Sequence, residues 1–231
     1  MRVAALYDVH GNLPALEAAL AEIEREEPDL VLVGGDVSAG PFPAETLELL
    51  RTGGEGVVWI RGNADRELDA WCAAQLSAEQ REFLGRLPIS VVLDVEALGP
   101  VLFCHGSPRS DDEILTRATP DDRLGDALAG VKERVVVHGH THVPYRRDFW
   151  HFQVVCPGSV GMPYGETGAH WALFGPGVAL RRTEYDLDAA AARIRASSWP
   201  EAARFAEENV LTVPDADEAV ELFERMARLE G

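Results

Sequence analysis

The sequence predicts an α/β fold in which short buried strands alternate with amphipathic helices. Apolar runs of a few residues, rich in Val and Leu, recur along the chain, and the early ones are each followed by a polar loop and a helical pattern. Asp, Asn or His stands in the loop after five of these strands. Hydrophobic residues make up 46% and charged residues 26% of the 231 residues, which is typical of a globular protein, and this length favours one large domain over two.

The first two strands each end in a loop that carries a carboxylate. Residues 3–7 lead to Asp8 and His10, and Leu residues at helical spacing follow. Residues 30–33 lead to Asp36, and a Gly/Pro-rich loop then precedes a helix over residues 44–51. Ligands of open α/β sheets bind beyond the carboxyl ends of strands, so these side chains are candidates for a site, although Asp8 alone also suits a turn.

A third strand over residues 57–60 leads to Asn63, with helical periodicity resuming through residues 68–72. Asp65 is most simply interpreted as the N-cap of that helix. A helix over residues 78–87 closes at Pro88, and two strands follow, residues 90–95 and 101–104. The second of these ends at His105.

The run over residues 135–142, V-V-V-H-G-H-T-H, is the most informative part of the chain. Three Val residues predict a strand buried on both faces. His140 and His142 can converge on one point if the chain turns at Gly139, whereas a pair of surface histidines is the alternative. His138 would face away from His140 on a regular strand, and we interpret it as a buried residue.

Downstream, residues 145–149, 152–156, 171–174 and 178–185 predict an antiparallel series of strands. Residues 187–197, 200–208 and 215–229 predict helices without clustered ligand types. We expect a single domain over residues 1–231, with the C-terminal helices of residues 187–231 packed on it. Their exposed faces leave self-association into a homo-oligomer open.

Charge and cysteine content limit the classes of partner. The net charge of −18 disfavours nucleic acid and anionic membranes as partners. Three widely spaced cysteines predict no disulfide framework, and no signal peptide or membrane-spanning run is seen, so we expect a cytoplasmic protein.

The strand ends together supply two carboxylates, one amide and four imidazoles. This mixed N/O set suits Mn, Fe, Zn, Co or Ni better than Ca or Mg, and seven ligands exceed what one ion needs. A carboxylate shared by two ions would use the set economically, which predicts a binuclear centre. The seven are Asp8, His10, Asp36, Asn63, His105, His140 and His142.

These motifs, D-x-H, G-D, G-N, H-G and G-H-x-H in order, resemble those of the calcineurin-like metallophosphoesterase superfamily. D-V-H-G-N-L-P-A-L, H-G-S-P-R and P-G-S-V-G are similar to its small bacterial and archaeal phosphodiesterase branch. The resemblance covers roughly residues 2–163. It implies a four-layer α/β/β/α sandwich with two mixed sheets.

The resemblance also implies the ligand assignment and the chemistry. One metal would be held by Asp8, His10, Asp36 and His142, and the other by Asp36, Asn63, His105 and His140. Two divalent transition-metal ions, with Mn favoured, would clamp a phosphate ester and generate a bridging hydroxide for in-line attack on phosphorus. The implied substrate is a small phosphate ester, most simply a diester, with nucleotides included.

Two positions modify this interpretation. Many members of the superfamily carry a histidine after G-N that assists the leaving group, and here that position is Ala64, so no catalytic side chain is predicted beyond the metal ligands. Loss of a general acid costs roughly 10²–10⁴-fold, so activated esters such as bis-p-nitrophenyl phosphate should suffer least. Arg109 is a candidate phosphate contact, with a surface ion pair as the alternative.

The motifs disfavour two other classes of phosphatase and hydrolase. The G-D-x-x-D-R-G motif of Ser/Thr protein phosphatases is absent, and amidohydrolases usually open with H-x-H. A non-catalytic metal-binding or scaffold protein on the same fold, as in the retromer subunit that resembles these phosphodiesterases, is the main alternative. Tyr164, Trp150 and Trp171 are candidates for stacking a base, with packing in the core or at its rim as the alternative.

Overall fold

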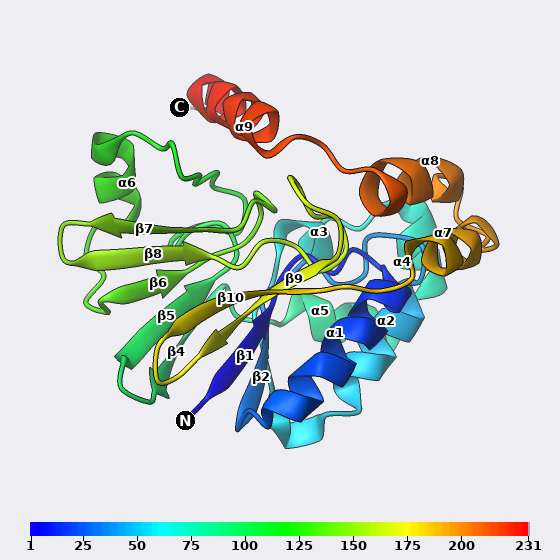
Figure 1. The fold of residues 1–231 in the computed structure, drawn as a ribbon, viewed down its shortest axis with the longest axis horizontal. Helices are drawn as coiled ribbons and strands as arrows, with labels where there is room; N and C mark the ends of the chain where they lie inside the picture. Colours follow the sequence, from blue (N-terminus) through cyan, green and yellow to red (C-terminus); the bar gives the residue numbers. More distant parts are fainter. Residues whose placement is uncertain (231) are drawn as a thin grey trace.

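Two five-stranded sheets form the centre of the fold in the computed structural model, which describes residues 1–230 (Figure 1). The first sheet has the order β10-β9-β1-β2-β3, and the second has the order β4-β5-β6-β8-β7. The strands of the first sheet are β1 (Val3–Leu6), β2 (Leu30–Val33), β3 (Val57–Trp59), β9 (Ala169–Phe174) and β10 (Val178–Thr183). Those of the second are β4 (Ser90–Val95), β5 (Gly99–Cys104), β6 (Val135–Val137), β7 (Tyr145–Phe149) and β8 (Phe152–Cys156).

Both sheets are mixed. In the first sheet β1, β2 and β3 are parallel, and β9 and β10 complete it in antiparallel fashion. In the second sheet β5, β6 and β8 are parallel, and β4 and β7 are antiparallel edge strands. The prediction of one antiparallel series over residues 145–185 is therefore wrong, because β7–β8 and β9–β10 are hairpins of different sheets.

The sheets pack face to face and helices cover their outer faces. In β6, Val135 and Val137 face the first sheet while Val136 faces α6 (Asp121–Ala127), which explains why three consecutive apolar residues form this strand. Phe103 and Phe174 meet edge to face between the sheets, with ring centroids 5.4 Å apart. The helices α1 (Leu13–Glu26) and α2 (Pro43–Arg51) cover the other face of the first sheet. The four-layer α/β/β/α prediction is thus confirmed.

Short helices separate the third strand from the second sheet. They are α3 (Asn63–Arg66), α4 (Ala70–Gln75) and α5 (Ala78–Gly85), and a 3-10 turn, Gly54–Gly56, precedes β3. The periodicity over residues 68–72 predicted one helix with Asp65 as its N-cap, but Asp69 is the N-cap of a separate helix, α4. Its carboxylate accepts the backbone N–H groups of Trp71 at 2.8 Å and Cys72 at 3.0 Å.

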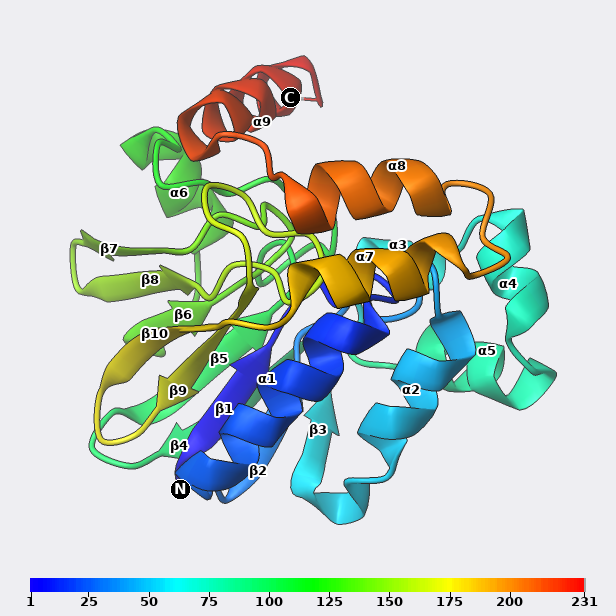
Figure 2. The same ribbon diagram turned by 45° about the vertical axis from the view of Figure 1, so that its right-hand side comes forward.

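The C-terminal helices lie along the edge where the strand-end loops gather (Figure 2). They are α7 (Leu187–Arg195), α8 (Ala202–Ala206), which continues into a π-helical turn over Glu207–Leu211, and α9 (Ala216–Glu230). Ala191, Ile194 and Phe205 form the apolar contact between α7 and α8. Among residues 1–230, none of the helices combines the length and apolar character needed to cross a membrane.

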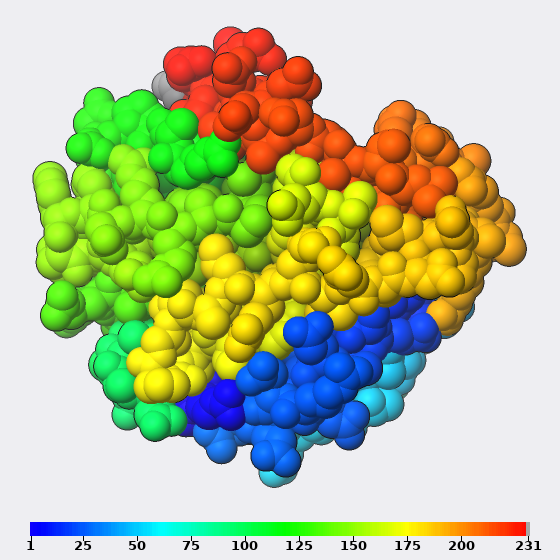
Figure 3. Space-filling model, viewed as in Figure 1, coloured from blue at the N-terminus to red at the C-terminus, as the bar shows by residue number. Residues whose placement is uncertain are grey.

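Buried Glu224 fixes α9 to the loop before α6. Its carboxylate accepts hydrogen bonds from Thr116 Oγ1 at 2.6 Å and Thr119 Oγ1 at 2.8 Å, and pairs with Arg123 at 2.5 Å. In the space-filling view the red C-terminal residues lie against the green residues of the second sheet and its flanking segments (Figure 3). The helix therefore flanks the same edge of the molecule as the strand-end loops.

Candidate metal centre

The strand-end loops bring Asp8, His10 and His142 together at the carboxyl ends of β1 and β6. These buried side chains offer ligand atoms that all lie within 4.8 Å of one another. His142 Nε2 lies 3.4 Å from Asp8 Oδ1 and 3.2 Å from His10 Nε2. Three donors of this kind and spacing form a group that could hold one cation.

A second group consists of Asp36, His105 and His140, again with ligand atoms within 4.8 Å of one another. His105 Nε2 lies 3.4 Å from Asp36 Oδ2 and 3.2 Å from Asn63 Oδ1. Asp36 Oδ2 also lies 3.7 Å from His10 Nε2 of the first group. The structure thus brings all seven predicted side chains to one place, with Asp36 between the two groups.

The chemistry of this donor set fits divalent cations. Asp8 Oδ1 is buried without a hydrogen-bond partner, and it faces ring nitrogens of His142 at 3.4 Å and His105 at 3.8 Å. His105 Nδ1 donates to the Gly34 carbonyl and His142 Nδ1 to the Met162 carbonyl, each at 2.8 Å. These bonds leave the Nε2 lone pair of both rings directed at the carboxylates, which is the tautomer that a metal ligand needs.

The two buried carboxylates of the centre need positive charge nearby. Burial opposes it, but His105 and His10 hold the pKa of Asp36 well below its usual range. Against burial, Asp36 and Asp8 raise the pKa of His105 to about 10, whereas burial and His105 lower that of His140 to about 4. Without metal, a proton on His105 therefore offsets only part of the charge of the two buried carboxylates. Cation binding would displace that proton.

Five of the candidate ligands have a left-handed backbone, which is rare for residues other than glycine. Their φ angles are 53° for Asp8, 46° for His10, 54° for Asp36, 67° for His140 and 57° for His142. Such a conformation costs of order 1–3 kcal/mol per residue and clusters at functional sites. Hydrogen bonds between the loops stabilise it, including His10 N–H to the Asp36 carbonyl at 2.8 Å and His140 N–H to Asp8 Oδ2 at 3.1 Å.

Two glycines allow the loops to approach the carboxylates. A Cβ atom on Gly62 would lie 2.1 Å from Asp36 Oδ1, and one on Gly139 would lie 2.7 Å from Asp8 Oδ2. Both distances are far below van der Waals contact, so any side chain here would displace a candidate ligand. The Ala64 N–H also donates to Asp36 Oδ1, at 2.8 Å.

The prediction that Asp65 is the N-cap of a helix is wrong, although its carboxylate does accept the N–H of the actual N-cap residue. Gly62 is the N-cap of α3, and Asp65 lies buried within its first turn. Asp65 Oδ2 accepts the N–H groups of Asp36 at 2.8 Å and Gly62 at 3.0 Å, while Oδ1 accepts that of Val37 at 2.9 Å. Its carboxylate therefore ties the Asp36 loop to the Asn63 loop, a long-range role that sequence spacing does not indicate.

His138 and Arg109 lie outside the two ligand groups. His138 is fully buried and its Nε2 pairs with the Tyr145 hydroxyl at 2.6 Å. Arg109 forms the surface ion pair considered as its alternative role, with Nε 2.9 Å from Glu113 Oε2 and Nη1 3.1 Å from the Asp126 carbonyl. A contact between Arg109 and substrate stays a prediction.

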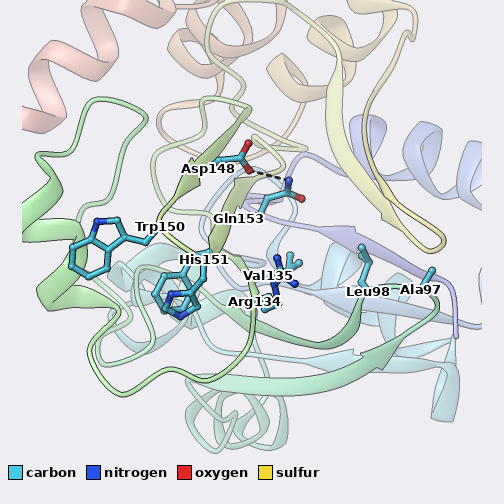
Figure 4. Close-up of a pocket in the computed structure, with 9 residues that line it drawn as sticks. Ala97, Leu98, Arg134, Val135, Asp148, Trp150, His151 and Gln153 are labelled. Atoms are coloured by element: carbon cyan, nitrogen blue, oxygen red, sulfur yellow. Dashed lines mark hydrogen bonds between the residues drawn. The ribbon is translucent and has the colours of Figure 1, made fainter.

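Two of the three aromatic residues considered for base stacking are in the wrong place. Trp171 is fully buried in the core, with Nε1 donating to Thr183 Oγ1 at 2.9 Å. Trp150 is 81% exposed in the β7–β8 turn, and the pairing of Val135 with Gln153 puts that turn at the opposite end of β6 from His140. A hollow of about 400 Å³ lies there, beside Trp150, His151 and Arg134 (Figure 4).

Tyr164 does lie at the centre, together with a residue that the sequence did not single out. The Tyr164 ring lies 5.2 Å from that of His142, and the Phe223 ring of α9 lies 6.4 Å from that of His140. The two aromatic rings are 6.2 Å apart. The apolar pattern of residues 215–229 predicted the helix of Phe223 but not its neighbours.

Comparisons with known proteins agree with the fold and the motifs. Residues 1–175 match the calcineurin-like phosphoesterase superfamily domain. Phosphodiesterase YfcE of Escherichia coli K12 is 27% identical over 183 residues, 72% of this chain and 83% of that protein. A metallophosphoesterase structure from Sphaerobacter thermophilus is 26% identical with a TM-score of 0.74, covering 92% of this chain and 98% of the other.

A further structure shares the fold. Hypothetical protein PH1004 from Pyrococcus horikoshii has a TM-score of 0.77 at 24% identity, and the match covers 89% of this chain and 97% of PH1004. The family match extends over more than half of the chain and includes every candidate ligand. The chain therefore belongs to the calcineurin-like phosphoesterase superfamily, a family of metal-dependent phosphoesterases.

Proposed function

We propose that this protein is a phosphodiesterase that uses two divalent cations, with manganese favoured, to hydrolyse a small phosphate ester. The observation that carries the proposal is the pair of adjoining N/O ligand groups with Asp36 between them. One cation would be held by Asp8, His10, Asp36 and His142, and the other by Asp36, Asn63, His105 and His140. The similarity to the Escherichia coli phosphodiesterase YfcE supports a diester as substrate.

Bound cations would supply Lewis-acid stabilisation of the phosphate and a water of lowered pKa. The chain itself contributes orientation. The Gly34 and Met162 carbonyls hold His105 and His142 in the Nε2-ligating tautomer, at 2.8 Å each. Asp65 holds the backbone of Asp36, so the central carboxylate is fixed before substrate binds.

The side chain at position 64 limits the range of esters. Ala64 has no titratable group to protonate a leaving group, although its N–H positions Asp36 at 2.8 Å. Esters whose leaving groups depart without a proton should therefore react best. Ala64→His should raise the rate on alkyl leaving groups more than on p-nitrophenolate, and equal effects on both would contradict this account of the position.

The experiment is hydrolysis of bis-p-nitrophenyl phosphate by protein loaded with Mn²⁺, Ni²⁺ or Co²⁺, with bound metal counted on the same samples. Asp36→Asn should lower both metal content and rate. Asp94→Asn is the matched control, since the Asp94 side chain is exposed on the edge strand β4. Absence of hydrolysis with all three metals would refute the proposal.

A scaffold built on the same fold is the second candidate, favoured by Ala64 at the position of the missing histidine. It predicts metal bound without hydrolysis. The presence of all seven candidate ligands, five of them with strained backbones, supports the enzyme instead.

A further inference from the structure

A pocket of about 380 Å³ lies between the loop that carries Tyr164 and the end of α8. This volume lies within the range of small-molecule sites. In Figure 2 the loop after β8 lies next to the carboxyl end of α8. Met162, Tyr164, Trp199, Phe205 and Asn209 are among the residues that line the pocket.

The pocket adjoins the metal centre through two of its lining residues. The Met162 carbonyl accepts a hydrogen bond from His142 Nδ1 at 2.8 Å. The Tyr164 ring lies 5.2 Å from the His142 ring, at an interplanar angle of 34°. Ala39, three residues after Asp36, lines the same pocket. A group held here would therefore lie within reach of a phosphate bound between the two ligand groups.

The lining suits a flat, uncharged group. Trp199 and Tyr164 are half-buried aromatic residues, and Trp199 meets Phe205 edge to face with ring centroids 5.4 Å apart. The half-buried Asn209 amide can both donate and accept hydrogen bonds. Aromatic platforms of this kind stack nucleobases with little dependence on sequence.

The charges of the pocket disfavour a second phosphate. Arg204 lines it but is neutralised by Glu201, with Nε 2.9 Å from Oε2. Glu208 adds another carboxylate, so the side chains of the lining carry net negative charge. A substrate that placed a further anionic group here would be repelled.

The walls are joined by the C-terminal segment. The Gly165 N–H donates to the Pro214 carbonyl at 2.8 Å, which links the Tyr164 loop to the chain between α8 and α9. Trp199, Phe205 and Asn209 all lie beyond residue 175, where the match to the family domain ends. The pocket is thus an addition of the C-terminal helices to the metal centre.

We propose that this pocket receives the uncharged, planar organic group of the phosphate ester, such as the nucleobase of a nucleoside ester. This inference rests on the proposed phosphoesterase function. It assigns a specificity role to Trp199 and Tyr164. The pocket would favour nucleoside esters over alkyl esters and over esters that carry additional phosphates.

The experiment compares two esters with the same leaving group, the p-nitrophenyl ester of thymidine 5′-phosphate and methyl p-nitrophenyl phosphate, on Mn²⁺-loaded protein. Wild type should favour the thymidine ester in kcat/KM by roughly 10- to 100-fold, the scale of one stacked base. Trp199→Leu and Tyr164→Leu should each lower this ratio at least about fivefold. Trp150→Leu, which changes an exposed Trp at the opposite end of the second sheet, should leave the ratio unchanged.

Binding of thymidine, read by saturation-transfer NMR, provides a measurement independent of turnover. Its signal should be present in wild type and in Trp150→Leu, and lost in Trp199→Leu that retains the wild-type circular dichroism spectrum. Hydrolysis of both esters at similar kcat/KM would overturn the pocket and leave the phosphoesterase standing. Hydrolysis of neither would overturn the phosphoesterase, and the thymidine signal would then decide the pocket alone.

Discussion

Replacing Asp65 by Asn tests whether a buried carboxylate serves the metal centre rather than the stability of the fold. The carboxylate accepts three backbone N–H groups, those of Asp36, Gly62 and Val37, at 2.8, 3.0 and 2.9 Å. Asparagine keeps only one oxygen. At least one of these N–H groups would then face an amide NH₂ and stay unsatisfied.

Two opposing contributions to stability follow from this geometry in the metal-free protein. An unsatisfied buried donor costs about 1–3 kcal/mol. Burial and the neighbouring Asp36 raise the pKa of Asp65 from 3.8 to about 6, so removing its charge restores roughly 3 kcal/mol at neutral pH. The free energy of unfolding of Asp65→Asn should therefore stay within about 2 kcal/mol of wild type.

The pH dependence has a defined sign. Because the folded-state pKa lies above the unfolded value, the contribution of Asp65 is complete below pH 3.8 and is lost as pH rises through about 6. The difference in free energy of unfolding between wild type and Asp65→Asn, measured by urea unfolding of metal-free protein, should show this loss. A difference that does not change between pH 4 and 7 would contradict the assigned cause.

Metal affinity should respond more strongly than stability. Loss of a group that orients a ligand typically costs 10- to 100-fold in affinity, and Asp65 orients the central ligand Asp36. Calorimetric titration of Mn²⁺ into metal-free protein measures this directly. Asp69→Asn is the matched control, since Asp69 accepts two backbone N–H groups at the start of α4. Unchanged Mn²⁺ affinity with a stability loss above about 3 kcal/mol would refute the reasoning.

Three further outcomes are expected. Saturation with Mn²⁺ at 100 times its Kd should raise the free energy of unfolding by about 2.7 kcal/mol, and equal Tm values in calorimetry with Mn²⁺ and with EDTA would contradict cation binding at Asp8 and Asp36. Burial raises the pKa of Cys72 and of Cys156 to about 12, so these thiols should not react with a disulfide reagent at pH 8 until the protein unfolds. Glu224→Ala should speed amide exchange in α9 at least tenfold in mass spectrometry, because it leaves the Arg123 guanidinium without its partner, whereas exposed Glu221→Ala should not.

The apolar patterns of the strands predicted the fold, because the burial of each strand face determines which of its residues must be apolar. The Val run of β6 must be apolar on both faces, since Val136 faces a helix while its neighbours face the other sheet. The same pattern ends abruptly where His138 and His140 begin. The convergence of seven polar side chains was predictable because the parallel strands of each sheet place their carboxyl ends at one edge of that sheet.

Other features depend on contacts between distant segments and leave no local pattern. Asp65 stands where a helix cap is common and accepts the N–H of nearby Gly62, yet its other two partners, Val37 and Asp36, lie 28 and 29 residues away. The hairpins β7–β8 and β9–β10 would show the same alternation of apolar and polar residues whether or not they belonged to one sheet. Phe223 belongs to an ordinary amphipathic helix, and the docking of that helix through Glu224 and the buried Ala219 and Val220 brings it near His140.

The strand order of the first sheet determines when the centre can form during synthesis. The Val160 N–H donates to the Tyr7 carbonyl at 2.9 Å, and Ser159 Oγ donates to that of Asp8 at 2.7 Å. Strand β9 covers the other edge of β1, although it is made more than 160 residues later. A nascent chain therefore carries an open apolar edge on β1 until residue 174 leaves the ribosome. Premature release before that point should yield an aggregating fragment rather than a smaller enzyme.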